Sequence, residues 1–394
     1  MARNVAVIGV GNTTYTSAKK ETRESSEVGA VCIKSGLDFV GDNLSLSDID
    51  AVYFASVDAF EGVQRPERMM DCFGSAFNIP VYFVNTGGTA GGSAVKEAYH
   101  AVAAGVYDIV IVYGSSTTSA TVEGQQILNS ASPALIEKPI GAGAIHMGGY
   151  YLTRYMQEYG ISEEDYAIVA AKSHRHSVNN PYAHIRRGYT VKEILDSPMV
   201  CSPIRLYEVC PVSAGATCLI MACEGKAEEL SDTPVWIRDI GSNTDTYLVG
   251  YKNFLGFQML KSLAERIYKR LGIKNPLEEI DYAELFNPFA GFEYLEYEAL
   301  GFCKEGEAPR LVHEGVTDLG GKLPVNLSGG TLCTNSGISA SISRHAETCL
   351  QLMGKIEGGR QVKDPKVGLS HAWGGNMGQF HTLTVFSREK ERGL

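Results

Sequence analysis

The sequence contains no run of about twenty apolar residues, which is the length that a membrane-spanning helix needs. Its first residues lead directly into an apolar strand pattern without the layout of a secretory signal, so we expect a cytoplasmic protein. The nine cysteines show no C-x-x-C spacing, which gives no sign of a zinc site and favours reduced thiols packed in the core. The net charge of −10 argues against a general nucleic-acid surface.

The sequence also lacks the G-x-G-x-x-G spacing of a dinucleotide-binding turn. A strand pattern at residues 4–10 leads to Gly9, Gly11 and Asn12, but no helix pattern follows, so we do not expect a nucleotide cofactor there. The overall composition is that of an ordinary globular protein. The 394 residues are 44% hydrophobic and 20% charged, which suits one large or two medium domains with buried cores.

The most informative stretch is residues 80–114. Two apolar runs, Val81–Val84 and Asp108–Tyr113, favour buried strands, and Ala94–Ala104 between them has a helical period, so a βαβ unit is predicted. Its turn, residues 86–93, contains four glycines. They let amide groups at the helix start face a ligand such as a thioester oxygen. Close packing of helix on strand explains the same glycines equally well.

A second unit of the same plan is predicted in the second half. Residues 323–354 repeat the order of a Val-Asn pair, a glycine turn and a helix. The pair at 325–326 matches that at 84–85, and the glycines at 329–330 match those at 87–88. Duplicated halves imply two stacked sheets about a pseudo-twofold axis, with helix starts from both halves converging.

We expect three regions in the chain. Residues 1–114 and 201–245 form the N-terminal half, and residues 246–394 form the C-terminal half, which ends in a glycine turn and a last strand. Residues 115–200 form a loop and covering region over the site. Further strands are predicted at Ile49–Ser56, Thr217–Ala222, Val235–Ile240 and Tyr282–Pro288, and further helices at Ser25–Val40, Met147–Tyr159, Ser162–His174, Phe257–Leu271 and Phe292–Leu300.

Four segments, in the same order along the chain, resemble the thiolase family. They are VNTGGTAGGSAV, IHMGGYYLTRYMQEYGIS, RLYEVCPVSAGATCLI followed by ELFNPF, and LGGKLPVNLSGG followed by the terminal GGNMG. The match is closest to lipid-transfer-protein-like thiolases of archaea and bacteria. The resemblance implies an α/β thiolase fold, in which two duplicated βαβ halves form a five-layered αβαβα sandwich.

The same resemblance indicates which reactive side chains are missing. The position of the nucleophilic cysteine is Gly88, that of the basic histidine is Thr334, and that of the second cysteine is Trp373. The acidic position of another motif is Asn287, whose amide can hold a water or a carbonyl. The backbone part survives, because the amides of Gly88 and Gly375 match the pair that forms the oxyanion hole.

The resemblance further implies coenzyme A as a substrate. His146 and Met147 match the histidine and methionine of the family's pantetheine loop, and Cys210 falls at a small-residue contact to CoA. Pro288 and Phe289 match the residues that line the pantetheine tunnel.

Five more residues are candidates by their own chemistry. Arg186, Arg187 and Arg205 can bind phosphates by charge-assisted hydrogen bonds, or can be solvated surface charges. Cys333 lies in the second glycine turn, where a helix start would favour a thiolate, although a packed small side chain is an alternative. His371, two residues before Trp373, is either a general base or a structural histidine.

Taken together, the resemblance and these residues imply CoA-dependent thiolysis of a bulky β-ketoacyl-CoA. An example is 2-benzoylsuccinyl-CoA, which is split into benzoyl-CoA and succinyl-CoA in anaerobic toluene degradation. The missing cysteine leaves open a thiolase-fold retro-aldolase that cleaves a β-hydroxyacyl-CoA, and a non-catalytic scaffold that binds acyl-CoA. We also expect a homodimer. The resemblance implies a small zinc-ribbon and OB-fold partner that carries the zinc, since this chain has no closed set of Cys and His ligands.

Overall fold

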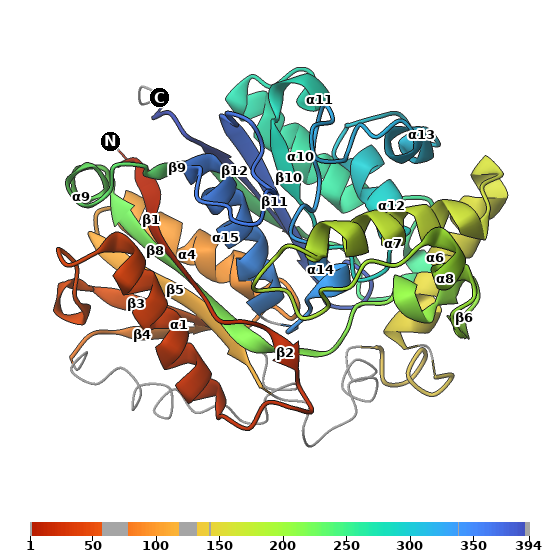
Figure 1. Cartoon of the computed structure of the whole chain (residues 1–394), viewed down its shortest axis with the longest axis horizontal. Helices are drawn as coiled ribbons and strands as arrows, with labels where there is room; N and C mark the ends of the chain where they lie inside the picture. The colour runs from red at the N-terminus through yellow and green to blue at the C-terminus, as the bar shows by residue number, and fades with distance from the viewer. Residues whose placement is uncertain (1, 57–77, 118–131, 142, 338, 391–394) are drawn as a thin grey trace.

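The computed structural model describes residues 2–56, 78–117, 132–141, 143–337 and 339–390 (Figure 1). The strands are β1 (Val5–Asn12), β2 (Thr16–Ser17), β3 (Ala51–Ala55), β4 (Val81–Val84), β5 (Ile109–Ser116), β6 (Met199–Cys201), β7 (Ile204–Arg205), β8 (Ser213–Cys223), β9 (Val235–Thr244), β10 (Tyr282–Glu284), β11 (Val367–Gly374) and β12 (Phe380–Ser387). The helices are α1 (Ser25–Val40), α4 (Ala90–Ala103), α6 (Ala144–Tyr159), α7 (Glu163–Ser177), α8 (Val191–Leu195), α9 (Glu224–Leu230), α10 (Gln258–Leu271), α11 (Pro276–Glu279), α12 (Phe292–Ala299), α13 (Ala308–His313), α14 (Gly330–Cys333) and α15 (Ser339–Met353).

The main sheet consists of two halves joined at a narrow point. Its strand order among the described residues is β10-β11-β12-β9-β1-β8-β5-β3-β4, with β2 beside β8. Strand β9 pairs with β12 along its whole length, but it pairs with β1 only through Ala6–Trp236 and Val7–Val235. β9 therefore bridges the two halves, although the proposed boundaries assign residues 235–245 to the N-terminal half.

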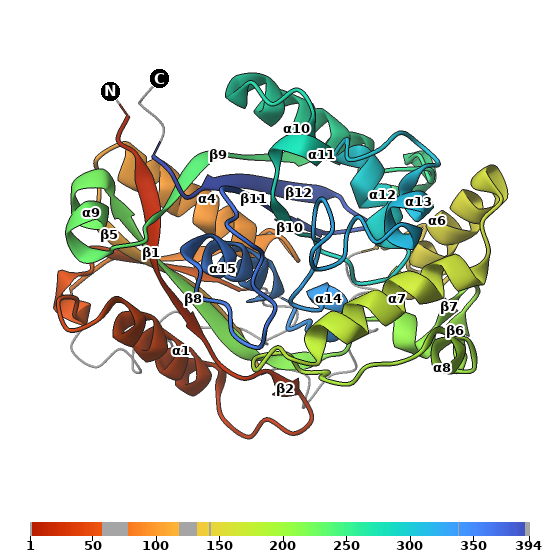
Figure 2. The same ribbon diagram turned by 45° about the horizontal axis from the view of Figure 1, so that its top comes forward.

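The elements stack in five layers, as Figure 2 shows from above. Helix α1 covers the outer face of the β1-β8-β5-β3-β4 half, α4 and α15 lie between the two halves, and α10 and α12 cover the far side. The alternation in β1 explains the layering, since Val5 and Val7 pack toward α4 and α15 while Ala6 and Ile8 pack against α1. The predicted five-layered αβαβα sandwich is confirmed.

The βαβ unit predicted for residues 80–114 is present as β4, α4 and β5. Strand β3 lies between β4 and β5 and is parallel to both. The helix of the unit begins at Ala90, four residues earlier than predicted, so two of the four glycines lie in the helix. An added Cβ would lie 2.6 Å from Ile342 at Gly91 and 3.0 Å from the Cβ of Thr382 at Gly92. These two glycines therefore let α4 pack closely on α15 and β12.

The second unit departs from the predicted repeat. Helix α4 begins five residues after Asn85, whereas α15 begins thirteen residues after Asn326. The added residues form α14 and the turn that follows it, and Gly329 is the N-cap of this four-residue helix. The second turn is therefore longer than the first, and the match between the glycines at 329–330 and those at 87–88 stays a prediction. The last glycine turn also joins two antiparallel strands, β11 and β12, where the sequence predicted one.

The covering region lies over one end of the molecule. Helices α6, α7 and α8 gather beside α12 and α14 in Figure 1, and α7 packs against α14 and α13. Residues 118–131 of this predicted region lie outside the described residues. None of the described helices is long and apolar enough to cross a bilayer.

Candidate active site

The two glycine turns that were predicted to form an oxyanion hole lie in contact. Gly87 and Gly88 precede α4, and Gly375 follows β11. An added Cβ at Gly87 would lie 3.2 Å from the amide nitrogen of Gly375, and one at Gly88 would lie 3.0 Å from the carbonyl oxygen of Trp373. Gly375 has φ of +71°, a conformation that strains any other residue. The fold thus brings together the two residues whose amides the sequence had paired.

Trp373, which the resemblance matches to the second thiolase cysteine, places an apolar ring in the core. It is 5% exposed at the end of β11, and its ring centroid lies 6.0 Å from Phe257, 5.7 Å from Phe286 and 5.8 Å from Phe292. An aromatic cluster therefore stands where the family has a reactive thiol.

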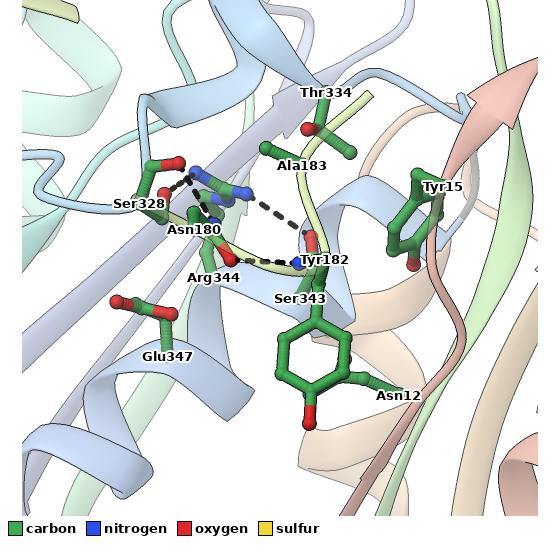
Figure 3. Close-up of a pocket in the computed structure, with 10 residues that line it drawn as sticks. All are labelled: Asn12, Tyr15, Asn180, Tyr182, Ala183, Ser328, Thr334, Ser343, Arg344 and Glu347. Atoms are coloured by element: carbon green, nitrogen blue, oxygen red, sulfur yellow. Dashed lines mark hydrogen bonds between the residues drawn. The ribbon is translucent and has the colours of Figure 1, made fainter. Parts of the chain in front are cut away.

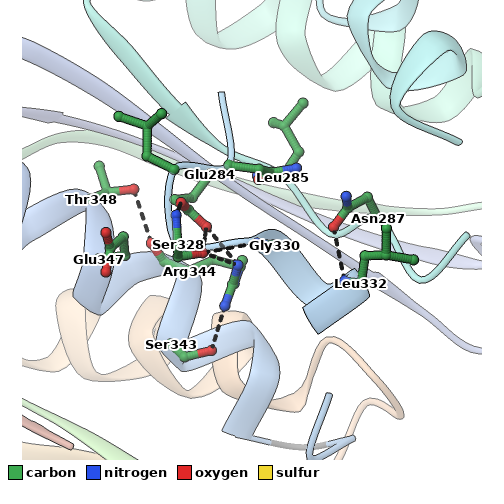
Figure 4. A network of polar contacts seen from close by, with 12 residues as sticks. Glu284, Leu285, Asn287, Ser328, Gly330, Leu332, Ser343, Arg344, Glu347 and Thr348 are labelled. Carbon is green, nitrogen blue, oxygen red and sulfur yellow. Dashed lines mark hydrogen bonds and ion pairs between the residues drawn. The ribbon is translucent and has the colours of Figure 1, made fainter. Parts of the chain in front are cut away.

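Asn287 is held by a buried ion pair. Its Nδ2 donates to Glu293 Oε1 at 2.7 Å. Its Oδ1 accepts from the amide of Leu332 at 3.3 Å, as Figure 4 shows. Glu293 pairs with Lys172 at 2.6 Å, with both side chains at most 1% exposed. Asn326 Nδ2 donates to the same carboxylate at 2.9 Å. The sequence pointed to Asn287, but not to the charges that fix its orientation.

Cys333 is the last residue of α14, so it lies at the negative end of that short helix. The prediction that a helix start favours the thiolate of Cys333 is therefore wrong. The side chain is fully buried, and burial raises the pKa of its thiol to about 12. Its Sγ lies 3.5 Å from Nδ1 of His174. At neutral pH this is a protonated thiol beside a neutral imidazole.

His174 is a neighbour that the sequence analysis missed. Its Nε2 lies 2.9 Å from the carbonyl oxygen of Tyr207, so Nε2 carries the proton and Nδ1 is left to accept from the thiol of Cys333. Burial lowers the pKa of His174, which favours this neutral form. The only signal in the sequence is a pair of histidines, His174 and His176, at the end of a predicted helix.

His371 is fully buried between His381 and Glu296. Its Nε2 is 3.2 Å from Nδ1 of His381, and its Nδ1 is 3.5 Å from Glu296. Burial, with a contribution from His381, lowers the pKa of His371 well below its usual range. Burial also raises the pKa of Glu296 well above its usual range. Both ring nitrogens of His371 therefore face other side chains, and the imidazole is neutral at physiological pH.

Several of the predicted CoA contacts lie together, although they come from three separate segments. The amide of Cys210 donates to the carbonyl oxygen of Pro288 at 2.9 Å. An added Cβ at Gly148, the neighbour of Met147, would lie 2.8 Å from the ring of Phe289. The start of α6 thus packs on the Pro-Phe pair, as a shared binding wall requires.

The charged CoA candidates differ in their availability. His146, Arg186 and Arg187 are exposed on the covering region. Arg205 is half-buried, and its guanidinium is bonded to Glu163 at 2.8 Å. Arg187 also pairs with Glu193, at 3.5 Å, so both pairs would have to open or share their charge with a phosphate.

A small polar hollow lies beside Thr334, the residue at the position of the family's basic histidine (Figure 3). Its lining residues are Asn12, Tyr15, Asn180, Tyr182, Ala183, Ser328, Thr334, Ser343, Arg344 and Glu347. Thr334 Oγ1 accepts from the amide of His184 at 3.1 Å. Arg344 donates to Glu284 at 2.6 Å and to Ser328 at 2.7 Å (Figure 4). The hollow thus contains bonded polar groups and no histidine that would replace the missing base.

In the part of the chain that the structure describes, no group of three or more His, Cys, Asp or Glu side chains is placed to hold a metal ion.

Comparison with known proteins agrees with the fold. Residues 5–194 match the family model described as "Thiolase, N-terminal domain", and residues 241–388 match "Thiolase C-terminal domain-like". The chain therefore belongs to the thiolase superfamily. It is an enzyme of the acyl-CoA C-acyltransferase type.

Among its relatives is the acetyl-CoA acetyltransferase of Methanothermobacter thermautotrophicus, 29% identical over 98% of this chain and 100% of the relative. Human sterol carrier protein 2 is 30% identical over 94% of this chain and 70% of that protein. The benzoylsuccinyl-CoA thiolase subunit BbsB of Thauera aromatica is 28% identical over 80% of this chain and 81% of that subunit.

A solved structure titled "Ltp2-ChsH2(DUF35) aldolase" superposes with a TM-score of 0.83 at 22% identity, covering 99% of both chains. A monomeric SCP2-thiolase-like protein of Mycobacterium smegmatis superposes with a TM-score of 0.73 at 18% identity, covering 98% of this chain and 77% of the other. At these identities the superpositions support the fold alone.

Proposed function

We propose that this protein cleaves a carbon–carbon bond of a bulky β-ketoacyl-CoA with free CoA as the acyl acceptor. The proposed substrate is 2-benzoylsuccinyl-CoA or a close analogue, and the products are benzoyl-CoA and succinyl-CoA. The similarity to the subunit BbsB over 80% of the chain supports this substrate class. The reaction would then belong to the anaerobic breakdown of an aromatic compound.

The observation that carries the proposal is the contact between the two glycine turns. Gly88 and Gly375 lie at a helix start and a strand end, where amide groups can stabilise a developing oxyanion. The reactive side chains around them have been replaced by a glycine, a threonine and a tryptophan. Such a site retains electrostatic stabilisation but has lost the usual acyl-enzyme.

The chemistry can run without a protein nucleophile. The thiol of free CoA loses its proton, and the thiolate attacks the ketone carbon. The bond between the α and β carbons breaks, and its electron pair passes to the departing thioester as an enolate. The Gly88 and Gly375 amides hold the enolate oxygen until the α carbon is protonated. His381 and His371 are buried, neutral imidazoles with strongly lowered pKa values, so we propose that water carries the protons, that Asn287 holds a water or carbonyl, and that His371 supports the strand before the Gly375 loop through its bond to His381.

The CoA arm is proposed to run along the wall formed by Met147, Cys210, Pro288 and Phe289, with His146 beside the pantetheine. The exposed residues Arg186 and Arg187 are proposed to meet its phosphates, and Arg205 to support them from its pair with Glu163.

Retro-aldol cleavage of a β-hydroxyacyl-CoA is the second candidate. It is favoured by the state of Cys333, whose thiol is protonated and at the wrong end of a helix for activation. Lyase chemistry needs a base and an oxyanion hole but no nucleophilic thiol, so the same site would serve it.

The requirement for free CoA tests the proposal. We expect consumption of 2-benzoylsuccinyl-CoA, followed by liquid chromatography, to depend on added CoA and to yield benzoyl-CoA. We expect Cys333→Ala to keep turnover within about threefold, because a thiol of such high pKa is a poor acyl acceptor.

Cleavage of a β-hydroxyacyl-CoA without added CoA would favour the lyase. A loss of a hundredfold or more in Cys333→Ala would place the acyl group on Cys333. If calorimetry shows CoA binding but no turnover is found, with or without a partner subunit, the result would favour a non-catalytic scaffold that binds acyl-CoA.

We also propose that the chain self-associates through β4 and binds a small zinc-ribbon, OB-fold subunit. Strand β4 is the last strand of the sheet, and Tyr82 on it is 41% exposed, so its outer edge can pair with a second copy. Light scattering of the purified chain should therefore give the mass of a dimer, and a larger mass when the partner is added. A monomer at micromolar concentration would exclude the homodimer.

A further inference from the structure

The loop between β11 and β12 carries Gly375 and has an unusual backbone. Gly375, Met377 and Gly378 have φ of +71°, +48° and +70°. A non-glycine residue such as Met377 adopts this left-handed conformation only when its surroundings impose it. The contacts that impose it come from outside the hairpin.

Lys252 holds the loop by its carbonyl groups. Its Nζ donates to the carbonyl oxygens of Asn376 at 2.7 Å and Met377 at 2.8 Å. The Lys252 side chain is 2% exposed, and Asp245 lies 3.8 Å from its ammonium group. Burial lowers the pKa of Lys252 to about 8, partly offset by Asp245 and Glu137, so it is charged at neutral pH.

Glu137 holds the same loop by its side chain. The Nδ2 of Asn376 donates to Glu137 Oε2 at 2.7 Å and to the carbonyl oxygen of Tyr247 at 3.0 Å. The other oxygen of Glu137 accepts from the amide of Val249 at 2.7 Å. Glu137 is 6% exposed. One carboxylate thereby ties the loop to the segment that carries Lys252.

Beside the loop lies His381, whose pKa burial lowers to about 3, partly offset by a hydrogen bond to the backbone of Gly378. Asp245, Glu137 and His381 are therefore the titratable groups that face Lys252. Because His381 stays neutral across the physiological range, the charges that act on the loop are those of Lys252, Glu137 and Asp245. The bonds of Lys252 and Glu137 end on Asn376 and Met377, one and two residues after Gly375, while Asp245 acts on the loop through Lys252.

We propose that Lys252 and Glu137 are positioning residues, which clamp the β11–β12 loop so that the amide of Gly375 faces the reacting oxygen beside Gly88. This inference rests on the proposed function, because that function assigns the Gly375 amide to the oxyanion hole. The clamp itself, however, is a property of the loop and can be measured without substrate.

The test compares Lys252→Met, Lys252→Arg and Glu137→Gln in the full chain, with its partner subunit where one is needed. Lys261→Met is the matched control, because Lys261, which lies on α10, forms an exposed ion pair with Glu305. By hydrogen-exchange mass spectrometry, Lys252→Met should raise exchange in residues 375–380 about tenfold, and Lys252→Arg should restore most of the protection. The control should leave the loop unchanged.

In the kinetic arm, Lys252→Met should lower kcat about thirtyfold and change the KM for CoA less than about threefold, since the lost interaction acts in the transition state. Activity of the parent chain should fall as the pH rises through about 8, where Lys252 loses its charge. This fall should move to higher pH in Lys252→Arg, because an arginine stays charged.

Unchanged loop exchange in Lys252→Met would overturn the clamp. Raised exchange with an unchanged kcat would overturn its role in positioning Gly375. If the parent chain has no activity on 2-benzoylsuccinyl-CoA, the proposed function fails, and the exchange arm still decides whether the clamp exists.

Discussion

The Gly88→Cys variant is expected to be a poorer enzyme than the parent chain, not a repaired thiolase. The added Cβ would lie 3.0 Å from the carbonyl oxygen of Trp373 and 3.2 Å from the Cα of Gly374. Both are backbone atoms of β11, which is paired at these two residues with His381 and Phe380 of β12. The start of α4 must therefore move away, and the Gly88 amide moves with it. We expect kcat to fall about a hundredfold, as for the loss of an oxyanion donor.

The variant should also fail to form an acyl-enzyme, because Thr334 stands at the position of the family's basic histidine. Turnover of 2-benzoylsuccinyl-CoA and intact-mass spectrometry measure the two effects. Gly225→Ala is the control, since nothing lies within 4 Å of an added Cβ on that glycine in α9. Comparable melting temperatures would show that Gly88→Cys still folds. An acyl adduct at position 88 with raised turnover would contradict the account of the site.

Much of the fold could be predicted, because its signals are local. The alternation in β1, the glycine-rich junction after β4 and the period of α1 each depend on residues close in sequence. The contact between Gly88 and Gly375 also followed from motif order, as the family resemblance carried it. The start of α15 could not be predicted, since the turn after α14 interrupts a segment that consists mostly of small residues.

The candidate site was harder to predict, because its energetics depend on burial. The sequence placed Cys333 in a glycine turn, but it could not show that the residue ends a short helix inside the core. His174, Lys252 and Glu137 were missed for a related reason. Each lies far in sequence from the group it contacts, and a lone charged or imidazole side chain in a chain of 394 residues carries no signal of its partner.

Lys172→Met is expected to destabilise the fold more than any substitution at the surface. It removes the cation that balances Glu293, at 1% and 0% exposure, and leaves a carboxylate buried without a countercharge. Such a loss costs about 3–5 kcal/mol of the free energy of unfolding. The hydrogen bonds from Asn287, Asn326 and Tyr297 still stabilise the carboxylate, so the chain should fold but unfold at lower urea.

Two further variants separate the charge from the packing. In Lys172→Met with Glu293→Gln, a neutral amide oxygen can still accept from Asn287 and Asn326, so urea unfolding should regain a large part of the lost stability. Lys322→Met breaks an exposed ion pair with Glu278 and should change stability by less than about 1 kcal/mol. If the stability of Lys172→Met in urea is instead as close to that of the parent chain as the stability of Lys322→Met is, Glu293 is a neutral acid in the folded state. Asn287 is then held by a neutral acid, and the electrostatic field at the site is weaker than the ion pair implies.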